Sequence, residues 1–438
     1  MQVKEERLHP LRRAANEDRA KPYHSLRYNR LKAEPIPASA VEKLDSLIDL
    51  FYDPDSMKWL VEEAEYYLYD TKARNYSLWS SNFDPQMQAM IPEIKNEISY
   101  STENQITGFT YYNWVDASKY WQPTDRSSIT YDANGRQTAF VSFTWDEIAK
   151  KWVNYFSDTT SYTGSGNIWK KFSYEYDTVT MDWNPFYRDE YSYDGNDLLV
   201  QRNSSSWLVD TVSRWENSTE TFYFYDDQGR DTSSLQRYWD GFFWQESSKR
   251  TSGYDAAGNI VQEADYFWDG ESQYIGSYKT EHTYDGNNRQ IGSVSYNWDF
   301  LKMDWYIYDK DEFIWDANGN LIEEISYLYD ITSQAFTPDW KDFYEYDLSV
   351  EVKDIAMPYW WYDDLSEQKG GAVAVNKISS SLEFTWNSQM LRYDTSNISS
   401  IHYSSLYDSP VNDADCKADF SWRLHAEDDF LVLFTDMS

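Results

Sequence analysis

The sequence lacks the residues that disulfide-stabilised, metal-binding and helical membrane proteins need. It holds one cysteine, Cys416, in 438 residues, so no internal disulfide can form. Its five histidines are scattered without the spacing of a metal site. No apolar run is long enough to cross a bilayer, and Met1–Glu34 has no hydrophobic core of a signal peptide. We therefore expect no membrane insertion and no signal peptide in this sequence.

Positive charge is also scarce. Lysine and arginine number 39 against 74 acidic residues, which gives a net charge of −35. Nucleic-acid binding needs a basic surface, so we expect no nucleic-acid partner. The charge opposes adsorption to anionic lipid as well. Two interpretations stay open: the charge keeps an aromatic-rich sheet soluble, or it attracts a cationic partner.

Recognisable catalytic motifs are missing. There is no Gly-rich phosphate loop, no nucleophile elbow and no CxxC pair. Asp189 and Glu190 could serve acid–base chemistry, but a solvated strand face explains them as well. We predict that the chain is not an enzyme and needs no cofactor. Structural Ca²⁺ is the open alternative, although one carboxylate per turn is few for such a site; the turn aspartates are Asp132, Asp226, Asp255, Asp285 and Asp316.

Aromatic residues, in contrast, are abundant and periodic. They make up 18% of the chain, with 39 Tyr and 21 Trp. Trp145 is followed by Trp152 after seven residues, by Tyr162 after ten more, and by Tyr176 after another fourteen, so one unit spans 31 residues. About ten such units follow one another, and their final aromatics are Tyr69, Tyr100, Tyr131, Tyr162, Tyr193, Tyr225, Tyr254, Tyr284, Trp315 and Tyr346.

The spacing within the unit predicts β-hairpins. The intervals of ten and fourteen residues are fixed, whereas the interval between the first two aromatics varies from five to eight. Fixed intervals are typical of paired strands, where a one-residue slip turns every side chain to the other face. The variable interval is then a loop tip. The second turn, as in Tyr131-Asp-Ala-Asn-Gly-Arg136, has the Asp and Gly of a hairpin turn.

Alternation along the strands predicts two unlike faces. Val141, Phe143 and Trp145 recur at every second residue and belong on one face. Basic residues five positions before the second turn belong on the opposite, charged face: Lys95, Arg126, Arg188, Lys249, Lys279, Lys310 and Lys341. We predict an all-β, antiparallel β-hairpin repeat array of about ten 31-residue units, elongated or spiral, or closing on itself.

The chain divides into three parts by composition. Residues 1–40 form a basic arm that we expect to be mostly disordered. Residues 41–361 form the hairpin array. Residues 362–438 hold a linker, one more degenerate hairpin within 381–403, and a capping tail.

Trp pairs beside the first turns are the candidate ligand-binding residues. Equivalent positions in successive hairpins form rows, and aromatic platforms suit sugar rings or cations. Packing within the sheet is the competing interpretation. The candidates are Trp114, Trp121, Trp145, Trp152, Trp298 and Trp305.

The turn sequences Tyr131–Arg136 (YDANGR) and Tyr225–Arg230 (YDDQGR) resemble the YD repeats of Rhs and teneurin-type proteins, which build spiral β-hairpin shells. The longer pattern of Trp-turn and Tyr-Asp turn resembles tandem repeats in secreted and surface proteins of Bacteroidota. This resemblance implies an extracellular or cell-surface location.

Two functions follow as expectations. The first is a non-catalytic adhesin or glycan-binding scaffold with a glycan or another surface protein as its partner. The second is a structural component of an extracellular shell, stalk or filament, for which self-association is the sign.

Overall fold

The structure is a computed structural model that describes residues 42–53, 57–70, 72–87, 89–209, 212–358 and 374–405, together with strands 420–424 and 432–436. These residues form β-strands and one short 3₁₀ helix, η1 (Val352–Asp354). The all-β prediction is confirmed. No helix among the described residues has the length and apolarity needed to cross a membrane. The predicted arm of residues 1–40, most of the predicted linker, and Cys416 lie outside the described residues.

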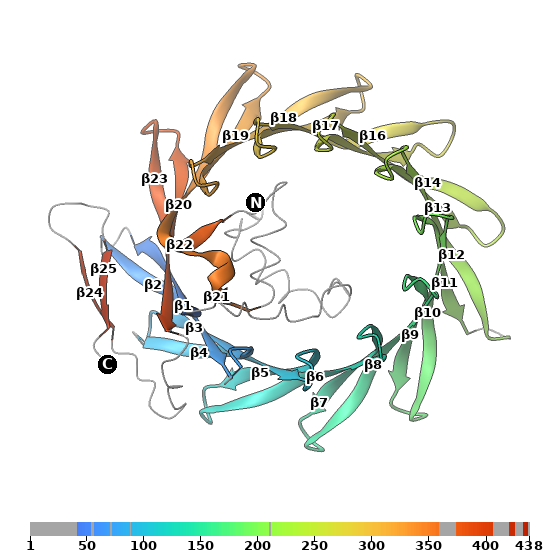
Figure 1. Cartoon of the computed structure of the whole chain (residues 1–438), viewed down its shortest axis with the longest axis horizontal. Helices are drawn as coiled ribbons and strands as arrows, with labels where there is room; N and C mark the ends of the chain where they lie inside the picture. Colours follow the sequence, from blue (N-terminus) through green and yellow to red (C-terminus); the bar gives the residue numbers. More distant parts are fainter. Residues whose placement is uncertain are drawn as a thin grey trace.

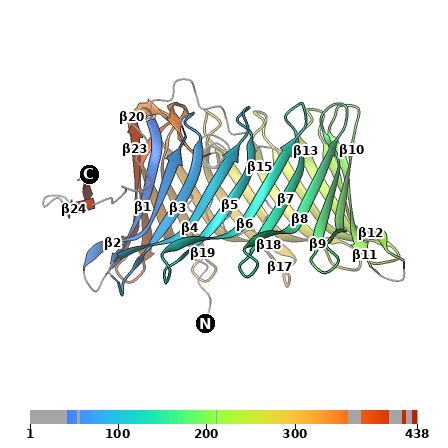
Figure 2. The ribbon, with the colours of Figure 1, turned by 90° about the horizontal axis from the view of Figure 1, so that it is seen from below.

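The strands form a closed barrel. Each strand of the barrel wall pairs antiparallel with the next wall strand, and β1 (Glu42–Asp53) pairs antiparallel with the last wall strand, β23 (Arg392–Ser405). Figure 1 shows the resulting ring, and Figure 2 shows its tilted strands from the side. Of the 23 strands in this sheet, 22 make the barrel, and the short β21 (Ile355–Ala356) pairs parallel with β1. The predicted closure is therefore confirmed.

The other strands follow in chain order. They are β2 (Lys58–Tyr69), β3 (Asn75–Asp84), β4 (Ala89–Tyr100), β5 (Ile106–Val115), β6 (Tyr120–Tyr131), β7 (Gln137–Asp146), β8 (Lys151–Tyr162), β9 (Ile168–Asp177), β10 (Asp182–Tyr193), β11 (Leu199–Leu208), β12 (Arg214–Tyr225), β13 (Asp231–Trp239), β14 (Trp244–Tyr254), β15 (Ile260–Trp268), β16 (Tyr274–Tyr284), β17 (Gln290–Asp299), β18 (Asp304–Trp315), β19 (Leu321–Asp330), β20 (Ala335–Glu351) and β22 (Asn376–Asn387). A separate two-stranded sheet joins β24 (Phe420–Leu424) to β25 (Val432–Asp436).

The Tyr-Asp turns hold one rim of the barrel. In the turn after β6, Asp132 accepts hydrogen bonds from the backbone N–H groups of Asn134 and Arg136, at 2.9 Å each. Gly135 has φ +77°, a conformation that glycine adopts without strain. Arg136 donates back to the Asp132 carboxylate at 2.8 Å. The hydroxyl of Tyr131 donates to the carbonyl of Ile106, which ties this turn to the preceding unit.

A β-bulge interrupts the second strand of nearly every hairpin. Tyr111 pairs with Asp125 and Tyr112 with Pro123, so the ladder skips Thr124. Ten of the eleven hairpins skip the equivalent residue: Glu62, Thr124, Tyr155, Phe186, Ser218, Ser247, Ser277, Tyr308, Asp339 and Ser396. Bulges bend the strand, and Figure 1 shows the hairpin ends splayed outward from the ring.

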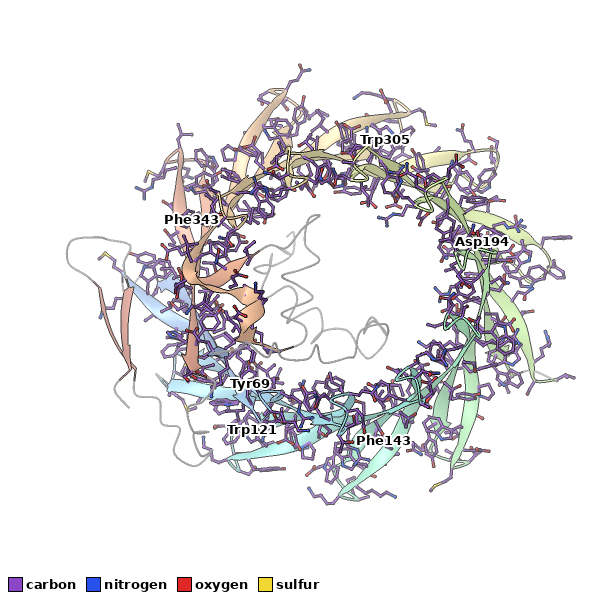
Figure 3. The ribbon with its side chains drawn as sticks, in the orientation of Figure 1. Tyr69, Trp121, Phe143, Asp194, Trp305 and Phe343 are labelled. Atoms are coloured by element: carbon purple, nitrogen blue, oxygen red, sulfur yellow. The ribbon has the colours of Figure 1, made fainter. Side chains whose placement is uncertain are left out.

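The bulge also reverses which face a side chain occupies, and this corrects one prediction. Arg126 was expected opposite the aromatic rows, but its guanidinium lies over the ring of Phe143, 4.6 Å from the centroid. Figure 3 shows Phe143, Trp121 and Trp305 on the outside of the ring. The skipped residue between Trp121 and Arg126 changes the alternation by one. Aromatic and basic side chains therefore share the outer face.

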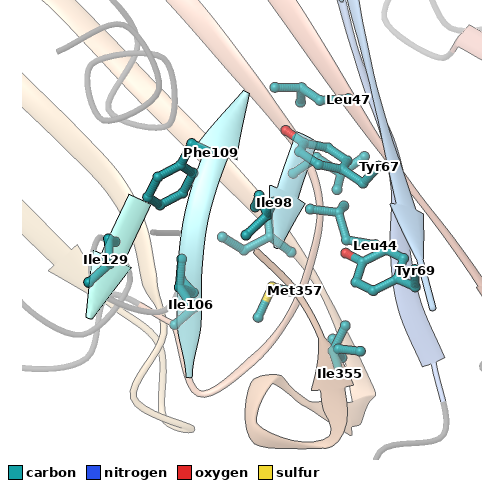
Figure 4. Packing of buried hydrophobic residues seen from close by; sticks show 14 of the residues in the cluster. Leu44, Leu47, Tyr67, Tyr69, Ile98, Ile106, Phe109, Ile129, Ile355 and Met357 are labelled. Carbon is teal, nitrogen blue, oxygen red and sulfur yellow. The ribbon is translucent and has the colours of Figure 1, made fainter. Parts of the chain in front are cut away.

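The inner face carries the buried core. Ile129, Phe109 and Phe140 are at most 3% exposed and pack in one cluster with residues of β1, β2 and β21. Figure 4 shows this cluster, in which Ile355 and Met357 lie near Leu44 and Tyr69. On this stretch of wall the 355–357 segment covers apolar side chains that would otherwise face the interior.

An eleventh hairpin completes the wall. The hairpin predicted within 381–403 is present as β22 and β23, and Trp386 faces Tyr393 across it. Trp360, the aromatic that extends the fourteen-residue interval past Tyr346, lies outside the described residues. Trp386 holds the paired position instead, so this unit is longer than 31 residues.

Candidate binding surfaces

The six predicted Trp residues meet in three pairs on the outer face. Trp114 and Trp121 pack edge-to-face with centroids 5.2 Å apart, and Trp145 and Trp152 do the same at 5.1 Å. Trp298 and Trp305 lie 5.0 Å apart at 81°. All six rings are half-buried. Edge-to-face pairs contribute about 0.5–1.5 kcal/mol beyond the area they bury. The spacing predicted this pairing, and sugar binding by these rings stays a prediction.

Basic side chains cover part of these rings. The Arg126 guanidinium is 5.4 Å from the centroid of Trp152, and the Lys279 ammonium is 5.8 Å from that of Trp305. Lys279 also lies 3.9 Å from the centroid of Tyr296. Such cation–π contacts stabilise the outer face. They leave less of each Trp face open to a ligand.

Carboxylates pair with these basic side chains on the outer face. Lys279 forms an ion pair with Glu281 at 2.8 Å, and Lys310 forms one with Glu312 at 2.6 Å. The Tyr296 hydroxyl donates to Glu281 at 2.9 Å. Burial, together with Glu281, raises the pKa of Tyr296 to about 12. Charged groups therefore stand on the outer surface partway up the wall.

On the inner face, acidic groups have specific partners. Asp189, 5% exposed, accepts two hydrogen bonds from Arg202 at 3.1 and 2.9 Å and one from Ser204 at 2.6 Å. Glu190 lies on the outer face and pairs with Lys170 at 2.5 Å. The alternative of an acid–base pair is therefore wrong, because adjacent strand residues point to opposite faces.

A second inner cluster joins three strands. Glu263 of β15 pairs with Arg250 of β14 at 2.5 Å, and His282 Nε2 of β16 lies 3.9 Å from it. His282 and Arg250 lower the pKa of Glu263 to about 2. Arg250 is the nearer of the two partners of Glu263.

The turn aspartates are engaged by their own turns. The Arg136 backbone N–H, followed by its guanidinium, lowers the pKa of Asp132. Asp226 and Asp285 make the same contacts with Arg230 and Arg289. Across residues 42–405, apart from the stretches left undescribed, no three His, Cys, Asp or Glu side chains gather closely enough to hold a metal. Calcium at these turns stays a prediction.

The rim opposite the Tyr-Asp turns exposes apolar side chains that were not predicted from the sequence. Nine of the eleven hairpin loops on the Trp side expose them, and Ile148 and Leu301 are each 97% exposed. We call these residues the tip ring: Met57, Met87, Ile148, Val179, Met181, Val209, Val212, Phe242, Phe243, Phe300, Leu301, Met303, Ile331, Met390 and Leu391. The signal was available, because apolar residues are unusual in short turns.

An aspartate fixes the backbone of many of these loops. Asp146 accepts hydrogen bonds from the N–H groups of Ile148 and Ala149, at 3.0 and 2.9 Å. Asp240 does the same for Phe242 and Phe243, at 2.8 Å each. These bonds hold the loops in one conformation and leave their apolar side chains in solvent. The tip ring is thus a preorganised feature of the rim.

Comparison with known proteins gives structural similarity alone. No family model and no curated protein matches the chain. A porin-like protein from Bacteroides uniformis is 10% identical, with 83% of this chain and 97% of that one covered and a TM-score of 0.21. A DUF3836 family protein from Bacteroides vulgatus is 12% identical over 21% of this chain and 90% of its own, with a TM-score of 0.19.

A TcdB2-TccC3 structure without its hypervariable C-terminal region is 10% identical. The match covers 83% of this chain and 22% of that one, with a TM-score of 0.20. The similar structures therefore include β-rich proteins of Bacteroides and Tc toxin components. At these identities and TM-scores they assign neither a family nor an activity.

Proposed function

We propose that this chain is a non-catalytic adhesive scaffold, located outside the cell or at its surface, and that the tip ring is its contact surface. The observation that carries the proposal is the exposure of apolar side chains on nine of eleven loops at one rim. A single exposed apolar residue is ordinary, but its recurrence on loop after loop at one rim marks that rim as the candidate contact surface.

The barrel suits this role because it is a stiff support. Closure leaves the wall without a free edge strand, and aspartate hydrogen bonds fix many of the tips. A rigid, multivalent rim can attach through many weak contacts at once. At about 4.8 Å per strand and a tilt of about 40°, 22 strands give a barrel roughly 45 Å across.

Sugar binding by the outer Trp pairs is a second contact that this scaffold would offer. Their half-buried, cation-covered rings favour a packing role, so we place the main contact at the tips. Membership in a YD-repeat or Bacteroidota repeat family belongs to the same proposal, supported by the Tyr-Asp turns.

The closed wall favours one alternative, a structural unit of an extracellular shell or stalk. Light scattering across a concentration series separates the two functions. A shell or stalk subunit assembles as concentration rises, whereas an adhesive scaffold attaches to its target as a single chain.

The direct test is attachment of the full chain to immobilised bacterial and host cells. We compare the wild type with a tip variant carrying Ile148→Ser, Phe242→Ser, Phe243→Ser and Leu301→Ser. A matched control carries Phe224→Ser, Ile291→Ser, Ile314→Ser and Leu348→Ser, four exposed apolar residues near the Tyr-Asp rim. Loss of attachment in the tip variant alone supports the proposal. Equal attachment of all three proteins, or none by the wild type, refutes it.

A further inference from the structure

We infer that the tip ring docks on the surface of a lipid bilayer whose headgroups carry no net negative charge. This inference rests on the proposed adhesive function and names its partner. The order of side chains along two hairpins, the charges on the wall and the net charge of the chain support it.

Two hairpins present their side chains in the order that a membrane interface favours. In the β7–β8 hairpin, Ile148 stands at the tip, Lys150 and Lys151 follow, and the Trp145–Trp152 pair comes next. In the β17–β18 hairpin the order is Leu301, Lys302, and the Trp298–Trp305 pair. Aliphatic tips suit the acyl boundary, lysines extend to the headgroups, and Trp rings prefer the interface.

Charged side chains on the outer face limit how deeply the barrel can enter the bilayer. Lys279, Glu281, Lys310 and Glu312 point outward and lie farther from the tips than the Trp pairs do. Charged side chains are costly against hydrocarbon. The apolar tips can therefore enter the bilayer surface as far as the headgroup boundary, where the exposed Glu147–Lys150 pair beside Ile148 stays hydrated. The wall beyond the Trp pairs stays in water.

The net charge of the chain favours a lipid without negative charge, and it disfavours a second copy of the chain as the partner. A chain of charge −35 is repelled by an anionic leaflet and by another copy of itself. A neutral leaflet imposes no such repulsion. The tips also differ in side chain from loop to loop, for example Val179, Phe242 and Met390, so they need a partner that accepts any apolar shape.

The test is flotation of the full chain with phosphatidylcholine vesicles, using the tip variant and the matched control defined above. We expect the wild type and the control to float with the vesicles and the tip variant to bind about tenfold or more weakly. Replacing part of the lipid with an anionic lipid should weaken wild-type binding. Unchanged flotation of the tip variant overturns the inference.

Depth is measured with a spin label. Leu301→Cys in a Cys416→Ser background places it at a tip, and Leu348→Cys in the same background is the control at the opposite rim. With vesicles we expect oxygen, and not a polar relaxation agent, to reach the label at 301. The label at 348 should stay accessible to the polar agent. Equal accessibility at both positions overturns the inference.

The outcomes also separate this inference from the proposed function. If the wild type ignores vesicles but attaches to cells through its tips, the partner is a protein or glycan and only the lipid inference fails. If light scattering shows tip-dependent association of copies, the ring is a self-interface and the lipid inference again fails. If neither vesicles nor cells are bound, both fail.

Discussion

The Arg136 guanidinium lies over the Tyr162 ring, 4.5 Å from its centroid, and so links two successive units of the barrel. The same contact joins Arg74 to Tyr100 and Arg230 to Tyr254, both at 4.6 Å. The repeat is therefore more than a series of hairpins, because its turns stack on one another around the rim.

Replacing Arg136 should weaken this stack. We expect Arg136→Ala to lower the free energy of unfolding by about 0.5–1 kcal/mol through the lost cation–π contact, measured by urea denaturation. Arg392→Ala is the control, since Arg392 is 68% exposed and pairs at the surface with Asp394. A change below about 0.5 kcal/mol is expected there. Equal effects would show that the stacking contributes nothing.

Gly276 should tolerate no side chain. A Cβ at this position would meet the Trp298 ring at 2.4 Å and the Trp305 ring at 2.7 Å. We predict that Gly276→Ala costs about 1–3 kcal/mol because the Trp pair must move, and that Trp fluorescence shifts. Gly286→Ala, with no atom within 4 Å of its Cβ, should have little effect. Similar denaturation midpoints for both variants would contradict the packing role of the pair.

Asp189 should be sensitive to loss of its charge. It is 5% exposed and holds Arg202 and Ser204. Asp189→Ala removes the partner of Arg202, which is 40% exposed, and of the buried Ser204, and we expect a loss of about 1–3 kcal/mol in denaturant unfolding. Asp227→Ala, in an exposed turn position, is the control with an expected change below about 0.5 kcal/mol. A mild effect at 189 would mean that water reaches the pair.

Glu263 should give the barrel an acid-dependent stability. Its pKa in the folded chain is lowered to about 2, so the unfolded chain binds its proton at higher pH. The stabilisation is complete above the unfolded pKa and is lost as pH falls through the folded pKa. Between about pH 5 and about pH 2 we therefore expect the wild type to lose thermal stability more steeply than Glu263→Gln. Glu271→Gln should keep the wild-type slope, and parallel curves for all three would exclude the effect.

Closure should depend on the last hairpin. A chain that stops after residue 375 lacks β22 and β23 and leaves β1 and β20 as free edges. We expect this chain to associate in size-exclusion chromatography with light scattering, because open edges pair with other chains. A chain that stops after residue 405 keeps both strands and should elute like the full chain. Matching behaviour of the two truncations would show that the seam is dispensable.

Much of the wall could be predicted from the sequence. The fixed intervals predicted each hairpin and the pairing of Trp145 with Trp152, because strand register follows directly from residue count. The variable interval predicted the loop tips. The Asp and Gly of Tyr131–Arg136 predicted the turn.

Arg126 was assigned to the wrong face because the bulge was not predicted. The signal of the bulge is a proline two residues after the first-turn partner, at Pro92, Pro123, Pro185 and Pro338. Proline cannot donate to a regular ladder and marks a bulge or an edge. Closure depends on strand number and stagger around the whole sheet, which no single unit encodes.

The seam between β1 and β23 has a consequence for biosynthesis. The two strands that close the ring are the first and the last of the wall, with Asp49 beside Ser399. During translation every earlier hairpin can pair with its predecessor, yet the ring has to wait for the final wall strand to leave the ribosome. Until then the unclosed sheet has two free edge strands. We therefore expect ring closure, the last step of folding, to be the slowest and most error-prone.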